Sequence, residues 1–260
     1  VKPFTYALAI ANGKLSEEDE EVTGSLYRGV RNASGKNYSL MKWQIALVCS
    51  LNTAAQQVAD RLGACALREL WDKLGLRESE SLPLTRFSTN ATLGTERVYP
   101  INLAAAYIPF INGGRICRPT LIEEIQHQGG TTVFDVAQVV GRSVFSEDVA
   151  SLILEALADP KYKILPHQSA WSHLSDSVIT GEDGQKKYWY FLKTGTDSNP
   201  NPSGNQRAVL IVGGMISKKT GKPYIVMTYM GTQKQEGMNR KMWGNSALGE
   251  VWRRTLDIIQ

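Results

Sequence analysis

Cysteine and histidine are scarce in this sequence. Its 260 residues include only three of each. The cysteines and histidines lack the spacing of a zinc site, and three cysteines do not make a disulfide framework. We therefore expect no bound metal, and we expect Cys49, Cys65 and Cys117 to be buried, unpaired thiols.

Long apolar runs and blocks of basic charge are also missing. No stretch approaches the ~20 apolar residues that a membrane-spanning helix needs. The 29 basic and 25 acidic residues are interleaved, apart from the acidic run SEEDEE at 16–21, and the net charge is +4. This mildly basic, mixed surface does not favour nucleic acid as a partner.

Hydrophobic residues make up 42% of the chain, enough for a sizeable core. Apolar residues at helical spacing predict helices in the first part of the chain. β-branched and aromatic residues predict strands in its later part, with the last two strands joined by the polar turn SKKTGK. Helices are expected at 1–11, in two segments of 38–63 that meet near Ser50, at 65–76, at the start of 98–122, at 145–160 and at 245–259, and strands at 188–196, 208–216 and 223–231.

Pro3 indicates where the first helix begins. Proline is tolerated only in the first turn of a helix, where the N–H groups have no partner within the helix. The helix that continues through 4–11 therefore begins at most about three residues before Pro3. We interpret the chain as a fragment of a longer protein.

Three short motifs together suggest a catalytic site. They are Lys2 at a helix start, Ser-Leu-Asn at 50–52 and Lys-Thr-Gly-Thr at 193–196. Ser-x-x-Lys, Ser-Asp-Asn and Lys-Thr-Gly form the signature of β-lactamases and penicillin-binding proteins. Each motif alone is weak, so the other copies in the chain have to be weighed.

Ser-x-Asn also occurs at 88–90 and 203–205, both in irregular, turn-like sequence, where a cap or a turn is the simpler interpretation. Only the copy at 50–52 lies between two apolar helical segments. The second Lys-Thr-Gly, at 219–221, sits in the charged turn between two strands. The copy at 193–195 continues an apolar strand, where Gly195 would let a ligand approach the backbone.

Ser39 and Lys42 form the only complete Ser-x-x-Lys in the chain. On one continuous helix, Ser39 would lie roughly 16 Å from Ser50, too far to share a reaction centre. We therefore interpret Ser39 as a helix N-cap. Lys2 fits the motif instead, with a serine expected three residues earlier.

The chain resembles the transpeptidase domain of class A (bifunctional) penicillin-binding proteins. The matching phrases occur in family order and cover most of the chain. They are VKPFTYALA, SLNTAAQQVADRLG, LGTERVYPINLAAAYIPFINGGRICRPTLI, LKTGT and GEVWRRTLDII. The segments 160–188 and 197–205 depart from the family pattern.

The resemblance implies an α/β protein of the α+β kind with the β-lactamase/transpeptidase-like fold, in which helices flank an antiparallel sheet and an all-helical subdomain lies beside it. It implies that residues 1–260 are an N-terminally truncated transpeptidase domain. The nucleophilic serine would lie two residues before Val1, and two further strands would precede it. We therefore expect that residues 1–260 alone do not fold stably, because the strand at 223–231 would keep an unpaired edge.

The same resemblance assigns roles to the motif residues. Lys2 would take the proton of the serine, Ser50 would relay a proton to the leaving amine, and Asn52 would hold Lys2 and bind the substrate amide. The strand carrying KTGT would bind the terminal carboxylate and supply half of an oxyanion hole through the N–H of Thr196. Its residues are Lys193, Thr194, Gly195 and Thr196.

The implied reaction is the cross-linking of peptidoglycan stem peptides that end in D-Ala-D-Ala, through a serine acyl-enzyme that β-lactams also form. It needs no metal or organic cofactor. The resemblance further implies an extracytoplasmic location, an anchor outside this fragment and a glycosyltransferase domain in the parent chain. Two alternatives stay open: a carboxypeptidase or β-lactamase-type hydrolase of the same fold, and a non-catalytic domain that binds peptidoglycan or a partner.

Overall fold

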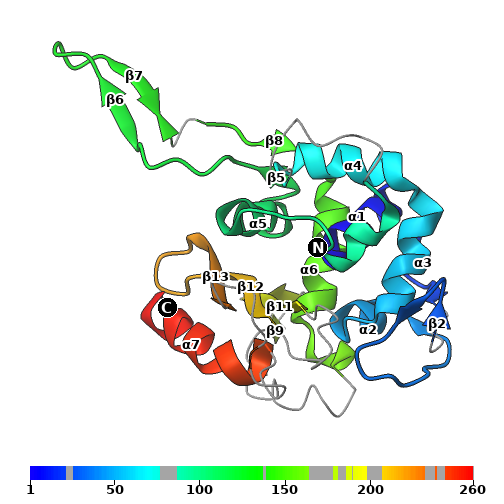
Figure 1. The fold of residues 1–260 in the computed structure, drawn as a ribbon. Helices are drawn as coiled ribbons and strands as arrows, with labels where there is room; N and C mark the ends of the chain where they lie inside the picture. The colour runs from blue at the N-terminus through cyan, green and yellow to red at the C-terminus, as the bar shows by residue number, and fades with distance from the viewer. Residues whose placement is uncertain are drawn as a thin grey trace.

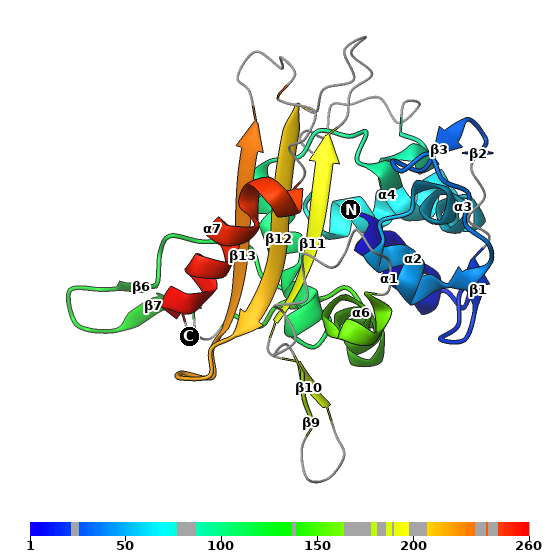
Figure 2. The same cartoon turned by 90° about the horizontal axis from the view of Figure 1, so that it is seen from below.

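The computed structural model describes residues 1–21, 26–76, 87–136, 139–163, 178–180, 186–188, 190–197, 207–231, 238 and 244–259. In this part of the chain, a three-stranded antiparallel sheet lies between one long helix and a group of shorter helices (Figure 1 and Figure 2).

The sheet consists of β11 (Tyr190–Asp197), β12 (Ala208–Ile216) and β13 (Pro223–Gly231), in that spatial order. Lys193 pairs with Val212, which pairs in turn with Met227 on β13. The turn at 217–222 closes the β12–β13 hairpin, as the sequence predicted. The three predicted strands are confirmed.

Helix α7 (Gly244–Ile259) covers one face of the sheet (Figure 2). Trp252 is 1% exposed, meets Tyr190 edge to face at 6.3 Å and donates its indole N–H to the carbonyl of Val226. The layer between α7 and the sheet is a separate apolar cluster. Its buried members are Tyr190, Leu192, Val209, Ile211, Met215, Val226, Leu248, Trp252 and Leu256.

The other face of the sheet meets the helical part of the chain. The helices are α1 (Lys2–Ala11), α2 (Trp43–Val48), α3 (Asn52–Leu62), α4 (Ala64–Lys73), α5 (Pro100–Ala106) and α6 (Glu147–Ala158), with 3-10 turns η2 (Thr89–Leu93), η3 (Ile108–Ile111) and η5 (Pro160–Tyr162). The rings of Phe4, Tyr107, Phe110 and Phe191 contact one another at centroid distances of 5.0 to 6.4 Å. These rings join α1, η3 and β11 into one core.

Helix α1 is surrounded by other elements. Its side chains at Phe4, Tyr6, Ala7 and Ala9 are no more than 1% exposed, and Thr5 bonds to Thr92 of η2 inside the core. A surface helix would show a polar face, whereas six of the ten residues of α1 are buried and most of the helix is apolar. The position of its first turn is therefore fixed by packing.

The remaining described strands form short antiparallel pairs outside the three-stranded sheet. They are β1 (Glu20–Glu21) with β4 (Met41–Lys42), β2 (Leu26–Tyr27) with β3 (Val30–Arg31), β5 (Arg115–Ile116) with β8 (Arg142–Ser143), β6 (Glu124–Gln126) with β7 (Thr132–Asp135), and β9 (Val178–Thr180) with β10 (Lys186–Tyr188). The β6–β7 pair projects from the body as an arm (Figure 1).

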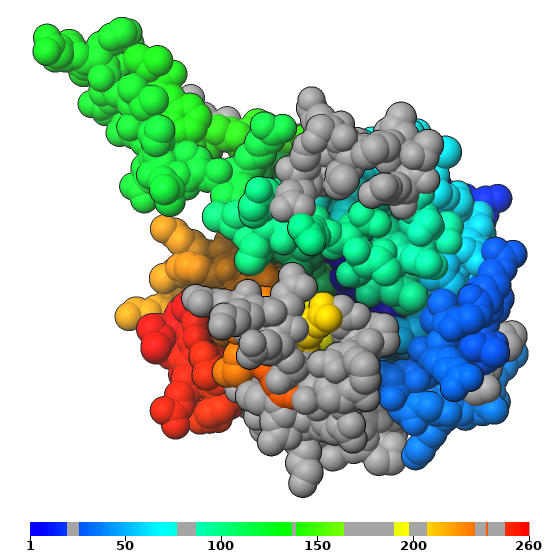
Figure 3. All heavy atoms as spheres, viewed as in Figure 1, coloured from blue at the N-terminus to red at the C-terminus, as the bar shows by residue number. Residues whose placement is uncertain are grey.

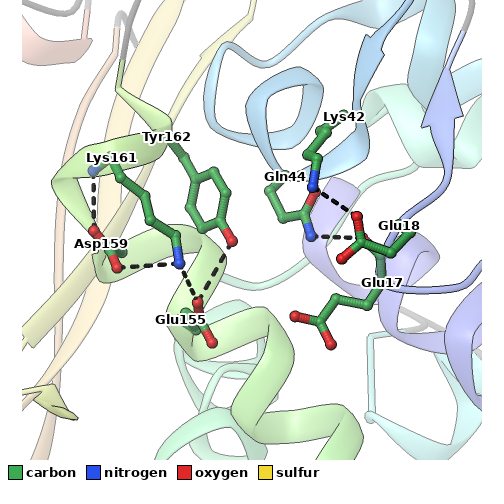
Figure 4. Close-up of polar contacts among 8 residues, drawn as sticks. All are labelled: Glu17, Glu18, Lys42, Gln44, Glu155, Asp159, Lys161 and Tyr162. Carbon is green, nitrogen blue, oxygen red and sulfur yellow. Dashed lines mark hydrogen bonds and ion pairs between the residues drawn. The ribbon is translucent and has the colours of Figure 1, made fainter. Parts of the chain in front are cut away.

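Polar contacts hold two surface segments onto the helices (Figure 4). In one group, Lys161 of η5 reaches back to Glu155 of α6 at 2.6 Å. In the other, Lys42 and Gln44 contact Glu18 and the backbone carbonyl of Glu17. The acidic run at 16–21 is thus attached to the start of α2. Exposed ion pairs of this kind contribute at most about 1 kcal/mol each.

The predicted helices are confirmed, including the cap of α6, where Ser146 Oγ accepts from the N–H of Val149 at 3.3 Å. Two details were wrong. Ser39 does not cap α2, because the strand residues Met41 and Lys42 come between Ser39 and the helix start at Trp43. The helix expected within 98–122 is split into α5 and η3, because Pro109 cannot donate the N–H that a continuous helix requires.

None of the three cysteines, all of which lie in the described ranges, forms a disulfide, as predicted. Only Cys49 is buried, however; Cys65 is exposed and Cys117 is partly exposed.

The packing of α7 on the sheet gives a direct test by mutation. Replacing Trp252 with Ala should lower the free energy of unfolding by about 3–5 kcal/mol, since it removes a buried ring from a closed layer. Replacing its neighbour Val251, which is 52% exposed, with Ala should change the free energy of unfolding by less than about 0.5 kcal/mol. Chemical denaturation of both variants measures the difference. Equal effects would mean that α7 does not cover the sheet through Trp252.

Candidate active site

Lys2 meets the corner between α2 and α3. Its Nζ donates to the backbone carbonyl of Ser50 at 2.9 Å, to Ser50 Oγ at 3.0 Å and to Asn52 Oδ1 at 2.7 Å. An ammonium has three N–H donors, and this corner supplies three acceptors. The structure therefore brings together the three predicted catalytic residues, although 48 positions of sequence separate Lys2 from Ser50.

Ser50 occupies an unusual backbone conformation. Its φ is +57°, in the left-handed region, directly after the C-cap residue Cys49 of α2. The N–H of Leu51 bonds to the carbonyl of Ala46, and the N–H of Ser50 bonds to that of Leu47. This is a Schellman motif, in which glycine is the usual residue at the left-handed position. Serine there costs on the order of 1 kcal/mol and supplies the hydroxyl that contacts Lys2.

Lys193 lies in the middle of β11 and is 5% exposed. Its Nζ donates to the carbonyl of Thr194 at 3.1 Å. Burial lowers the pKa of Lys193 to about 8. Burial, and then the positive charge of Lys193, lower the pKa of Lys2 to about 7. Near neutral pH a large share of Lys2 is therefore the free amine, which can accept a proton.

Cys49 is an additional neighbour that sequence reasoning did not place at the site. Burial raises the pKa of the Cys49 thiol to about 12, against the smaller opposing effect of the Lys193 charge. At neutral pH this side chain is a neutral thiol. It therefore places no negative charge beside Lys193.

The rest of the KTGT strand is divided between two faces. Side chains alternate along a strand, so Lys193 and Gly195 share the face of Phe191, which packs in the helical core. Thr194 and Thr196 share the face of Leu192, toward α7. Among the hydrogen bonds of the described residues, none joins either threonine side chain to Lys2 or Ser50. Their predicted part in carboxylate binding stays a prediction.

Gly195 has a packing reason that the sequence analysis did not give. It pairs with Leu210 on β12, and a Cβ added at Gly195 would lie 3.0 Å from the Leu210 Cγ atom. A side chain at this position would press on Leu210. On this face the glycine thus makes room for a neighbouring side chain, whereas a ligand would meet the backbone at the edge of β11. Among the described residues β11 pairs only with β12, so that other edge is unpaired.

In Figure 3, atoms of the N-terminal segment, in dark blue, and of β11, in yellow, are both visible near the middle of this face.

Two further residues hold Asn52. Asn52 Nδ2 donates to the carbonyl of Arg31 at 2.9 Å, and the N–H of Asn52 donates to Asn32 Oδ1 at 2.8 Å. Sequence reasoning missed both, because they lie about 20 positions upstream in a segment without periodic pattern. An asparagine in irregular sequence gives no signal of its own.

The competing motif copies lie elsewhere. Ser88 caps η2 by accepting from the N–H of Asn90, and Lys219 is exposed in the β12–β13 turn. Ser39 is exposed. The copy at 203–205 falls outside the described residues, as does most of 160–188 and 197–205.

Within the described ranges, no three His, Cys, Asp or Glu residues are grouped so that they could hold a metal ion. No helix described there is long and apolar enough to cross a membrane.

The family model for the penicillin binding protein transpeptidase domain matches residues 1–257. Penicillin-binding protein 1A of Aquifex aeolicus is 29% identical over 138 residues, which are 50% of this chain and 18% of that protein. The Haemophilus influenzae protein of the same name is 28% identical over 142 residues, 52% of this chain and 16% of that protein. The chain thus aligns with less than a fifth of these relatives.

Solved structures agree on the fold. The penicillin-binding protein PonA1 from Mycobacterium tuberculosis has a TM-score of 0.73 at 18% identity, covering 98% of this chain and 65% of that one. Penicillin-binding protein 1A from H. influenzae has a TM-score of 0.71 at 19% identity, covering 100% and 41%. The β-lactamase-like α+β fold is confirmed by these structures. The family match over residues 1–257 shows that the chain belongs to the penicillin binding protein transpeptidase domain family.

Proposed function

We propose that the protein is a serine-type D-Ala-D-Ala transpeptidase that cross-links peptidoglycan stem peptides and is acylated by β-lactams. The observation that carries the proposal is the Lys2 amine, with its pKa lowered to about 7, held 2.7–3.0 Å from Ser50 and Asn52. Membership of the transpeptidase family supports it.

The nucleophile in this proposal is a serine two residues before Val1. Residues three apart on a helix lie on the same side, so this serine would lie beside Lys2. Its Oγ attacks the carbonyl of the penultimate D-Ala, and its proton passes to the neutral amine of Lys2. The terminal D-Ala then leaves as an amine, and the acyl group remains on the serine as an ester.

Ser50 completes the proton path. Its hydroxyl contacts Lys2 at 3.0 Å, so it can receive a proton from Lys2 and pass it to the departing nitrogen. The amine of a neighbouring stem peptide then attacks the ester, gives up a proton along the reverse path and releases the serine. Asn52 fixes Lys2 and, in this proposal, also bonds the substrate amide.

The strand β11 binds the substrate in the proposal. The buried ammonium of Lys193 attracts the terminal carboxylate, and the hydroxyls of Thr194 and Thr196 donate to it. The backbone at Gly195 and Thr196 lines the edge, and the N–H of Thr196 supplies one donor to the developing oxyanion. Loss of such a donor typically costs about 3 kcal/mol in the transition state.

The wider setting is also a proposal. The transpeptidase would act on the extracytoplasmic side of the membrane, in a parent chain that carries an anchor and a glycosyltransferase domain. A hydrolase of the same fold would transfer the acyl group to water, whereas a transpeptidase transfers it to an amine. Product analysis with a stem-peptide donor and an amine acceptor separates the two. A non-catalytic domain would form neither product.

The first test is covalent acylation. The parent protein, extended upstream of Val1, should gain the mass of one penicillin in intact-mass analysis, and the adduct should map to the upstream serine. Replacing Lys2 with Met should slow acylation by about 10²–10⁴-fold, because the general base is lost. A folded parent protein that gains no mass would overturn the enzymatic proposal.

The pH dependence of acylation follows from the two lysines. Lys2 must be neutral to act, so the rate should rise as pH increases through about 7. Lys193 must be charged to attract a carboxylate, so the rate should fall as pH increases through about 8. A narrow bell between these limbs is expected in stopped-flow acylation of the parent protein. A rate that stays flat from pH 6 to pH 9 would contradict both assignments.

Lys193 and Lys219 provide a matched pair for the substrate-binding strand. Replacing Lys193 with Met should abolish fast acylation, whereas replacing the exposed Lys219 with Met should leave it unchanged.

The same pair tests the cost of burying Lys193. Its pKa falls from 10.5 to about 8 on folding, and each unit corresponds to about 1.4 kcal/mol. The unfolded chain therefore holds the proton more tightly, and the burial penalty is full below pH 8 and disappears above pH 10.5. Lys193→Met should therefore raise the free energy of unfolding at pH 7 by up to roughly 3 kcal/mol, and this gain should shrink toward pH 10.5. Chemical denaturation at several pH values measures it. A Lys219→Met variant stabilised to the same extent would show that burial of Lys193 is not the cause.

A further inference from the structure

We infer that Asn32 is a positioning residue of the reaction, acting through Asn52 on Lys2. The inference rests on the proposed function, because it concerns how the same site is held. It starts from the hydrogen bonds at the beginning of α3.

Helix α3 lacks a cap of its own. Its N-cap residue is Leu51, whose side chain has no acceptor. Asn32, which is 4% exposed, takes this role from a distant segment. Its Oδ1 accepts from the N–H of Asn52 at 2.8 Å, from the N–H of Thr53 at 3.2 Å and from Thr53 Oγ1 at 3.2 Å. Three donors converge on this atom, so it must be the amide oxygen of Asn32.

The neighbouring residue orients the side chain of Asn52. The carbonyl of Arg31 accepts from Asn52 Nδ2 at 2.9 Å. A carbonyl can bond only the NH2 end of an amide, so Oδ1 of Asn52 must point the other way, where it accepts from Lys2 Nζ at 2.7 Å. One segment, Arg31–Asn32, thus fixes both the backbone and the side chain of Asn52.

This segment is itself attached to α3. It belongs to the β2–β3 hairpin, whose turn carries Arg28. Arg28 Nη1 pairs with Asp60 Oδ2 at 2.9 Å, two turns along α3 from Asn52. Asp60 also accepts from Thr89 at 2.6 Å, so the anchor is tied into η2. Because Arg28 is largely exposed, the buried amide of Asn32 is the stronger of the two attachments.

The consequence is specific to Lys2. Without Asn32, the first N–H groups of α3 lose their acceptor and the segment that carries the Arg31 carbonyl is released. The Asn52 amide can then turn, and Lys2 loses its shortest hydrogen bond. Misplacement of a catalytic group by about 1 Å is enough to cost on the order of 100-fold in rate.

The experiment is a double-mutant cycle on acylation of the parent protein by penicillin. Asn32→Ala should slow acylation by about 10- to 100-fold, and Asn32→Asp, which keeps the acceptor, should restore most of the rate. In an Asn52→Ala background, Asn32→Ala should cost less than about threefold more, because its effect passes through Asn52. Additive losses in the cycle would overturn the inference.

Ser146→Ala is the matched control. It also deletes the cap of a helix, that of α6, but it does not touch Lys2, Ser50 or Asn52. It should lower the melting temperature as Asn32→Ala does and leave acylation unchanged. If Asn32→Ala does not fold, Asn32→Ser takes its place in the same cycle.

A second readout does not depend on acylation. Loss of an acceptor from the ammonium removes a bond that favours the charged form, so the pKa of Lys2 should fall in Asn32→Ala and in Asn52→Ala alike. Titration of the Lys2 side-chain carbon by NMR measures it in the protein without ligand. A Lys2 pKa unchanged by Asn32→Ala but lowered by Asn52→Ala would overturn the inference. An unreactive wild-type protein would overturn only the proposed function.

Discussion

A lysine ammonium taken out of water must find three acceptors or lose its proton, and the site depends on how this chain meets that constraint. Lys2 is at the start of a helix whose residues 3–7 and 9 are buried in the core, so packing fixes the position of its backbone. The acceptors come from one corner, where a backbone carbonyl, a hydroxyl and an amide oxygen follow within three residues. The left-handed backbone of Ser50 turns the chain sharply enough for these three acceptors to bond one ammonium.

The three acceptors do not keep the pKa of Lys2 at its ordinary value, and this is useful for chemistry. The acceptors favour the ammonium, while burial and the nearby charge of Lys193 favour the amine. With its pKa at about 7, the Lys2 side chain populates both forms near neutral pH, which suits a group that must gain and lose a proton in each cycle. For the charge of Lys193 to lower the pKa of Lys2, helix α1 and strand β11 must be held together. The ring cluster of Phe4, Tyr107, Phe110 and Phe191 does this.

Local patterns allowed much of this to be predicted from sequence. Helical spacing and strand composition gave the elements, and the apolar helical or strand context of Ser50 and Lys193 distinguished them from their copies. What escaped prediction depends on tertiary structure. Ser50 was recognised as a polar residue at a helix junction, but its left-handed backbone has no signature, since glycine normally marks that position. Asn32 acts across about 20 positions, and the reason for Gly195 is the Leu210 side chain on the next strand.

The projecting β6–β7 arm bears on how the sequence of this domain can change in evolution. The segment that carries the arm begins after β5 and ends before β8, and these two strands pair, with Arg115 opposite Ser143 and Ile116 opposite Arg142. There the approach is so close that a Cβ at Gly141 would lie 2.7 Å from Cys117 Sγ. Because the β5–β8 pairing joins the two ends of this segment, the length and sequence of the arm are uncoupled from the catalytic corner. Insertion, deletion or exchange of this segment is therefore a route by which the domain can diversify its outer contacts without altering its chemistry.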